Sequence, residues 1–168
     1  TEGFNPRTYV TFMLPLSLGQ EGIHEAMDFR LTEDVPYSEV RERLNAALPP
    51  DIQVTEITVP KDKNTDITAA RYHIESSADP EKLRALCARE QINVEKRTKK
   101  GSAIVDLKPL MTDVELHGDV LEVTLPAGTT FNINPSLIFE AYSAEYGEQV
   151  KRLKIVRTHI YSGDREFE

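Results

Sequence analysis

The chain of 168 residues contains a single cysteine, Cys87. One cysteine excludes an intramolecular disulfide, and it also excludes an iron–sulfur cluster held by several cysteines of this chain. No apolar run approaches the roughly 18 residues that a membrane-spanning helix requires. A secretory hydrophobic segment is also lacking. We therefore expect a cytoplasmic protein that does not enter the membrane.

Basic residues are in the minority, with 20 lysines and arginines against 28 aspartates and glutamates and a net charge of −8. This balance argues against general, salt-driven binding to nucleic acid or to an anionic membrane, because the long-range field repels polyanions. A local basic patch can still bind them. Hydrophobic residues make up 39% of the chain, enough for a core in one domain or two small subdomains.

Common catalytic and nucleotide-binding signatures are absent: there is no Gly-x-Ser-x-Gly elbow, P-loop or dinucleotide fingerprint. The histidines, His24, His73, His117 and His159, are scattered, and no pair has the i, i+4 spacing of a helical metal site. We therefore expect no metal in this chain. Cys87 follows Leu86 on the apolar face of an expected helix, so we expect its side chain to be a small buried hydrophobe. Catalytic residues stay unassigned.

In residues 26–98, segments with the hydrophobic period of a strand alternate with segments that have the period of a helix. Strands are expected where apolar and polar residues alternate, at 26–31, 52–59, 69–76 and 92–98. One helix is expected at 37–48, where apolar residues recur four apart. A second begins after Asp79-Pro80, an N-cap followed by proline. The order β-α-β-β-α-β predicts an α+β, ferredoxin-like subdomain with an antiparallel sheet and both helices on one face.

The remaining residues, 1–25 plus 99–168, repeat this theme incompletely. Further strands are expected at 8–14, 102–109, 112–118, 120–126 and 151–161. One helix begins after Asn134-Pro135, so this half lacks one helix of a second unit. We therefore predict two tandem ferredoxin-like halves, with the missing helix upstream of Thr1 in an N-terminally truncated chain.

The order of motifs resembles a bacterial family, the radical-SAM-linked domain of unknown function. The resemblance rests on EGFNPRTYVTFMLPLSLG (2–19), AMDFRLTE (26–33), VRERLNAALP (40–49), RTKKGSAIVDLKPL (97–110) and IVRTHIY (155–161). Members of this family are small separate proteins or C-terminal domains of cobalamin-type radical SAM proteins, and they begin with a strand and a helix before the GFNP motif. Arg7 stands where histidine is common in the family, so the resemblance carries no histidine role to that position.

The resemblance implies an accessory role rather than a defined activity. It suggests a binding module that docks onto a radical SAM enzyme or presents an RNA or ribosome-related client. Iron–sulfur and SAM chemistry would come only from that partner, so this chain is expected to hold no cofactor and not to be an enzyme on its own. The step from the family to RNA is an association and not a mechanism.

The GFNPR stretch contains the first two candidate contacts with an anionic client. Asn5 offers an amide, and Arg7 offers a planar donor fork that suits phosphate or carboxylate. The alternative is an ordinary turn, because glycine, asparagine and proline are common turn residues.

Two basic clusters supply the other candidates. The first consists of Lys96, Arg97, Lys99 and Lys100, reinforced by Lys108, and the second consists of Lys151, Arg152, Lys154 and Arg157. Such charges line an exposed edge, where they either deter aggregation or contact an anion. If both clusters border one sheet region, an otherwise acidic protein has a basic face of the kind that binds RNA. The predicted client contacts are therefore Asn5, Arg7, Lys99, Lys100, Lys108 and Arg157.

Two other functions stay open. Tandem ferredoxin-like halves around a cleft also describe pseudouridine synthases, RNA-modifying enzymes that use a single aspartate. Asp28 and Asp106 are the isolated strand carboxylates that would serve in that case. The third interpretation is a structural scaffold in which the basic clusters are solubilising edges.

Overall fold

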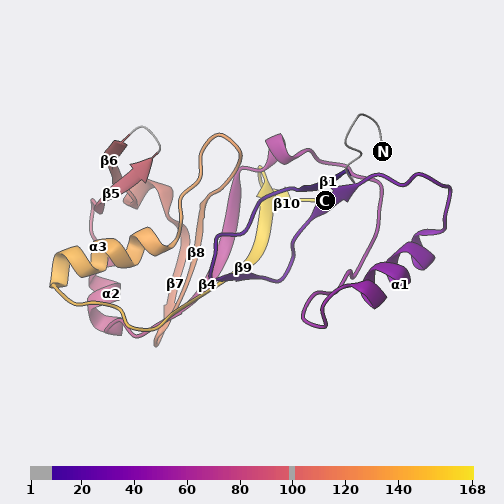
Figure 1. The fold of residues 1–168 in the computed structure, drawn as a ribbon. Helices are drawn as coiled ribbons and strands as arrows, with labels where there is room; N and C mark the ends of the chain where they lie inside the picture. The colour runs from indigo at the N-terminus through magenta and orange to yellow at the C-terminus, as the bar shows by residue number, and fades with distance from the viewer. Residues whose placement is uncertain (1–8, 99–100) are drawn as a thin grey trace.

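A computed structural model describes residues 9–98 and 101–168 (Figure 1). Within these residues three α-helices accompany one six-stranded sheet and two two-stranded sheets. The predicted α+β class is therefore confirmed. No helix in the described ranges is long and apolar enough to cross a membrane.

The six-stranded sheet forms the centre of the molecule. Its strands follow the order β10-β9-β4-β8-β7, and β2 pairs with β9 in parallel while the other pairs are antiparallel. The bounds are β2 Gln20–Gly22, β4 Ala69–Ser76, β7 Thr112–His117, β8 Val120–Pro126, β9 Leu153–Ser162 and β10 Arg165–Glu166. The central strand β4 buries every second residue, so one face of the sheet is packed and the other is half-exposed.

The helices α2 (Pro80–Cys87) and α3 (Ser136–Tyr146) share a core with the buried face of the sheet. Leu83 and Ile138, one from each helix, are fully buried. The expected start signals are present: the Asp79 side chain accepts hydrogen bonds from two backbone N–H groups of the first turn of α2. At the other end of α3, Gly147 adopts a left-handed φ of 67°, the usual glycine terminator.

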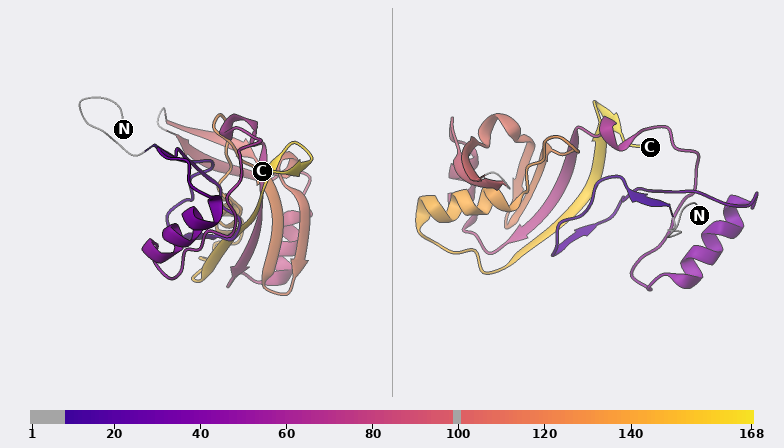
Figure 2. Two further views of the ribbon diagram at one scale, coloured as in Figure 1. Left: turned by 90° about the vertical axis from the view of Figure 1, so that its right-hand side faces the viewer. Right: turned by 45° about the horizontal axis from the view of Figure 1, so that its top comes forward.

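Two smaller units flank this core. The first, named here the ribbon, is the antiparallel pair β5 (Asn93–Thr98) and β6 (Gly101–Asp106), which lies beside α3 in Figure 1. The second, named the N-terminal lobe, covers residues 9–60. It contains the antiparallel pair β1 (Val10–Phe12) and β3 (Met27–Phe29) and the helix α1 (Tyr37–Ala47). Figures 1 and 2 show α1 standing apart from α2 and α3, at the opposite end of the molecule.

The short 3₁₀ helices η1 (Asn64–Asp66) and η2 (Lys108–Leu110) complete the described elements. The predicted strand at 52–59 is wrong, since no strand is assigned there in the described chain. Ile52 and Val59 are both exposed, and the alternation slips between them, so neither face of this segment is consistently apolar.

The predicted tandem of ferredoxin-like halves is not confirmed. The strands of residues 26–98 belong to three different sheets: β3 pairs with β1, β4 pairs with β8 and β9, and β5 pairs with β6. The two antiparallel neighbours of β4 both lie beyond residue 98. The division of the chain at residue 98 stays a prediction.

Candidate functional site

Four of the six predicted client contacts lie outside the described residues. These are Asn5, Arg7, Lys99 and Lys100, and their roles stay predictions. The other two, Lys108 and Arg157, have defined surroundings, and both are engaged within the protein.

Lys108 caps the end of helix α2. Its Nζ donates a hydrogen bond to the backbone oxygen of Cys87, the last residue of α2, at 2.7 Å. Carbonyl groups at a helix C-terminus have no intrahelical partner and favour cations. The Cys87 thiol beside it is half-buried, and burial raises its pKa while the Lys108 charge opposes that rise. This bond directs the ammonium toward the end of α2 rather than toward a client.

Arg157 is buried, with only 3% of its surface exposed. Its Nε donates to the Glu25 carboxylate at 2.8 Å, and its Nη2 donates to the same carboxylate and to the backbone oxygen of Leu14. These bonds tie β9 to the N-terminal lobe. The guanidinium also opposes, by its charge, the rise that burial causes in the pKa of Tyr72. Arg157 is therefore a structural contact in this geometry, and a client reaches it only by displacing Glu25.

The two basic clusters lie on different sheets. Lys96 and Arg97 belong to the ribbon, whereas Lys154 lies in β9 of the six-stranded sheet. The views in Figures 1 and 2 agree that the ribbon and the start of β9 lie apart. The second cluster is also paired internally, since Arg152 Nη2 donates to Asp119 at 3.1 Å and Lys154 lies between two glutamates. Among the described members of the two clusters, the conditional basic face is therefore not formed.

A groove lies between the ribbon and the start of helix α3, and we name it the ribbon groove. It has a volume of about 720 Å³ and is lined by residues 93–97 of β5, by Asn132 and Asn134 of the preceding loop, and by one side of α3. Within the described residues β5 pairs only with β6, so its other edge faces this groove. Gly101, the first residue of β6, has a φ of 129°, a conformation that glycine adopts without strain.

Lys96 joins the two walls of the groove. Its Nζ donates to the backbone oxygen of Asn132 at 2.6 Å and lies 4.8 Å from the centre of the Phe131 ring. On the α3 wall, Asn134 Oδ1 accepts hydrogen bonds from the Ser136 N–H at 3.0 Å and from Gln20 Nε2 at 3.1 Å. The loop before α3 is therefore held to the ribbon and to the N-terminal lobe.

Several polar groups of the groove remain available for a ligand. Arg97 is exposed, and within the described residues its guanidinium has no hydrogen bond or ion pair. The Asn134 side-chain amide uses only its oxygen in the part of the chain that is described. The N-terminus of α3 adds a partial positive charge. Glu95 and Glu140 also line the groove, so its positive character is local.

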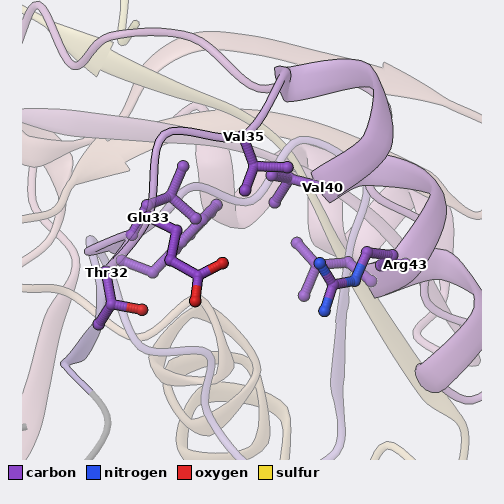
Figure 3. Close-up of a pocket in the computed structure, with 8 residues that line it drawn as sticks. Thr32, Glu33, Val35, Val40 and Arg43 are labelled. Atoms are coloured by element: carbon purple, nitrogen blue, oxygen red, sulfur yellow. The ribbon is translucent and has the colours of Figure 1, made fainter.

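A second hollow lies in the N-terminal lobe, between β3, the following loop and helix α1. It has a volume of about 460 Å³, and its lining residues are Phe29, Leu31, Thr32, Glu33, Val35, Val40, Arg43 and Leu44. Figure 3 shows Glu33 and Arg43 on opposite sides of the hollow, with Val35 and Val40 above the space that separates them. Arg43 has an exposed ion pair with Glu39 at 3.7 Å. Such pairs contribute little to stability. The charges of Arg43 and Glu39 are both exposed and therefore accessible.

The N-terminal lobe also exposes many apolar side chains. Twelve large apolar side chains are exposed in the described chain, and nine of them lie in this lobe: Tyr9, Val10, Phe12, Leu18, Ile23, Leu31, Tyr37, Ile52 and Val59. Within α1 only Val40 is buried. A concentration of this kind is typical of surfaces that meet another protein.

The strand register places three of the four scattered histidines on one face of the sheet. His73, His117 and His159 lie on the half-exposed face of the sheet, and the His24 ring lies 5.6 Å from the ring of His159. Glutamate oxygens lie 3.4–3.5 Å from the first three. No group of three or more metal-ligating side chains with suitable geometry occurs in residues 9–98 and 101–168. Because the register joins distant strands, spacing along the chain does not reveal that these histidines share a face.

The two aspartates of the enzyme hypothesis differ in their surroundings. Asp106 Oδ1 accepts hydrogen bonds from the backbone N–H groups of Ile92 and Lys108, at 2.8 and 3.0 Å. It therefore stabilises the turn that follows β6. Asp28 lies in β3 opposite Thr11 and lines neither of the two hollows.

Comparison with known proteins gives one match. A family model described as an uncharacterized protein conserved in bacteria, DUF2344, matches residues 1–135. No curated protein and no solved structure matches the chain. The expected bacterial family of unknown function is therefore confirmed, whereas its radical SAM link stays a prediction.

Proposed function

The chain belongs to the DUF2344 family of uncharacterized bacterial proteins, and from this premise we propose that it is a non-catalytic module that binds an RNA client. The client lies along the ribbon groove. The observation that carries this proposal is the position of Lys96 and Arg97 opposite the start of α3, across a groove of about 720 Å³. Cations, side-chain amides and a helix N-terminus are the groups that proteins use to hold phosphates.

The net charge of −8 bears on the kind of binding that we propose. An acidic protein does not attract RNA over long distances, so the interaction depends on contacts made inside the groove. Glu95 and Glu140 limit how many phosphates the groove accepts. The proposal therefore concerns a short segment of RNA rather than a long duplex held by charge alone.

The connectivity supports a ferredoxin-like unit, later in the chain than the sequence pattern predicts. The elements β4, α2, β7, β8, α3 and β9 occur in this order along the chain, with β5 and β6 between α2 and β7, and their strands have the spatial order β9-β4-β8-β7. This is the β-α-β-β-α-β arrangement of that fold. We propose that residues 69–162 form this unit and that the ribbon is an insertion between α2 and β7.

The rival enzyme hypothesis needs an aspartate in a basic cleft. Asp106 uses its oxygen to hold two backbone N–H groups, and Asp28 lies outside both hollows. The geometry therefore favours binding over catalysis by either residue. Fold analogy alone carries no activity to this chain.

Fluorescence anisotropy with a 5′-labelled, mixed-sequence RNA of 12 nucleotides tests the proposal. We expect Lys96→Ala together with Arg97→Ala to weaken binding on the order of tenfold. The slope of log affinity against log salt should become shallower by about 1.4, because each phosphate contact on a single strand contributes about 0.7. Lys151→Ala together with Arg152→Ala removes the same charge from the loop before β9 and serves as the control. Equal losses in both double variants, or no binding by the wild-type protein, would contradict the proposal.

A second candidate function is docking onto a radical SAM enzyme through the N-terminal lobe. The observation that favours it is the set of nine exposed apolar side chains in this lobe. We expect the protein to co-purify with a co-expressed radical SAM enzyme of its own bacterium. Phe12→Asp and Leu18→Asp should abolish that co-purification, whereas Ile104→Asp, on the ribbon, should not. Co-purification that survives the two lobe substitutions would argue against this surface.

A further inference from the structure

We propose that the ribbon groove selects single-stranded RNA, with one base stacked on the Phe131 ring while the neighbouring phosphates lie on Lys96 and Arg97. This inference rests on the proposed function and names the form of RNA that the same site takes. It is carried by the position of an exposed aromatic side chain next to the cations and amides of the groove.

Phe131 is 46% exposed and lies in the loop between β8 and α3. Beyond residue 60, no other phenylalanine or tyrosine of the described chain is exposed to this degree. A single exposed apolar residue is ordinary at a protein surface. Phe131 differs because the Lys96 ammonium lies 4.8 Å from the ring centre, which places a phosphate-binding cation beside a stacking platform.

The contact between Lys96 and the loop fixes the relative positions of these groups. Lys96 Nζ donates to the backbone oxygen of Asn132, so the ribbon and the loop that carries Phe131 are joined before a ligand arrives. Less side-chain freedom is then lost on binding, which favours affinity. A ring and an ammonium held together, with the Arg97 guanidinium on the next residue of β5, suit a nucleotide, which has a flat base and an anionic phosphate.

The two loop asparagines supply hydrogen bonds suited to base edges. Asn132 is exposed, and Asn134 has its Nδ2 donor unused within the described residues. Amides of this kind bond to the edges of bases that are splayed out of a helix. In a duplex the bases are stacked on one another and their faces are closed, so only the unpaired strand places a base on Phe131.

The test compares four probes by anisotropy: a 12-nucleotide single-stranded RNA, the same strand in a duplex, the same strand with abasic central positions, and the same sequence as DNA. We expect the wild-type protein to bind the intact single-stranded RNA at least fivefold more tightly than the duplex and the abasic strand. Phe131→Leu should weaken binding of the intact strand about five- to tenfold and leave the abasic strand unchanged. Phe131→Trp, which keeps the stacking surface, should retain the wild-type affinity.

Glu140→Gln provides an independent check on the site. Removing a carboxylate that lines the groove should tighten binding of the single strand about two- to fivefold, because it repels the incoming phosphates. This variant keeps the size of the side chain and distinguishes a groove contact from a change in folding. Unchanged affinity would remove Glu140 and the α3 wall from the site.

The outcomes separate this inference from the function on which it rests. If the duplex and the single strand bind equally and Phe131→Leu has no effect, while the Lys96 and Arg97 substitutions still weaken binding, then the stacking inference is wrong and the RNA-binding function stands. If no RNA probe binds the wild-type protein, the proposed function itself fails. Tighter binding of DNA than of RNA would overturn the assignment of RNA as the client.

Discussion

At the scale of single residues, two basic side chains predicted to contact a client form hydrogen bonds within the protein instead. Lys108 caps α2, and Arg157 joins β9 to the N-terminal lobe. The sequence indicates that these residues are charged, but it does not show that the Cys87 carbonyl and the Glu25 carboxylate lie beside them. Arg97 has no described partner and is therefore the clearer candidate for a client.

The buried guanidinium of Arg157 leads to a stability prediction. Glu25→Gln keeps the shape of the side chain but leaves Arg157 without its counter-charge. Because the Glu25 side chain is partly exposed, we expect the free energy of unfolding to fall by about 1.5–3 kcal/mol, the range for a hydrogen bond to a charged group. Urea denaturation measures this change. Glu21→Gln is the matched control, since its exposed ion pair with Lys154 should contribute under about 1 kcal/mol; equal effects would contradict the role given to Arg157.

Asp62 leads to a prediction about pH. The Arg165 guanidinium and the Glu168 backbone N–H lower the pKa of its carboxyl group. A carboxyl group whose pKa is lower in the folded state stabilises the fold above its unfolded pKa, about 3.9, and this contribution is lost as the pH falls through the folded pKa. We expect Asp62→Asn to lower the melting temperature at pH 7 and to have a smaller effect near pH 3. A loss of the same size at both pH values would contradict this explanation.

At the scale of elements, local sequence signals predict where strands and helices lie but not which strands pair. The strands β4, β7, β8 and β9 and the start of α2 follow from alternation and from the Asp79-Pro80 cap. Their arrangement depends on which distant strands meet. Residue 70, for example, pairs with residues 125 and 160, and no pattern near β4 specifies either partner. The ribbon groove could not be predicted for the same reason, since β5 and the loop before α3 are about forty residues apart.

The helix α1 leads to a prediction about local stability. It buries only Val40, and isolated helices of this length are marginal in water. Local opening requires little free energy where few apolar contacts are lost. We expect the amides of α1 to exchange with deuterium much faster than those of β4 and α3, as measured by hydrogen-exchange mass spectrometry. Equal protection of α1 and α3 would mean that the lobe is more firmly packed than its burial indicates.

At the scale of the whole molecule, an acidic protein presents three distinct surfaces. The ribbon groove has two cations beside two carboxylates, the N-terminal lobe exposes apolar side chains, and the half-exposed sheet face carries histidines paired with glutamates. Composition alone predicts weak general attraction to RNA. We therefore expect RNA to bind at only one of these surfaces, the ribbon groove.

A titration of the ¹⁵N-labelled protein with the single-stranded RNA of 12 nucleotides, followed by NMR, tests this central claim most directly. The account predicts that the largest shift changes occur at residues 93–97 and 131–136, on the two walls of the ribbon groove. Changes confined to the histidine-bearing sheet face or to the N-terminal lobe, with the groove unaffected, would contradict it.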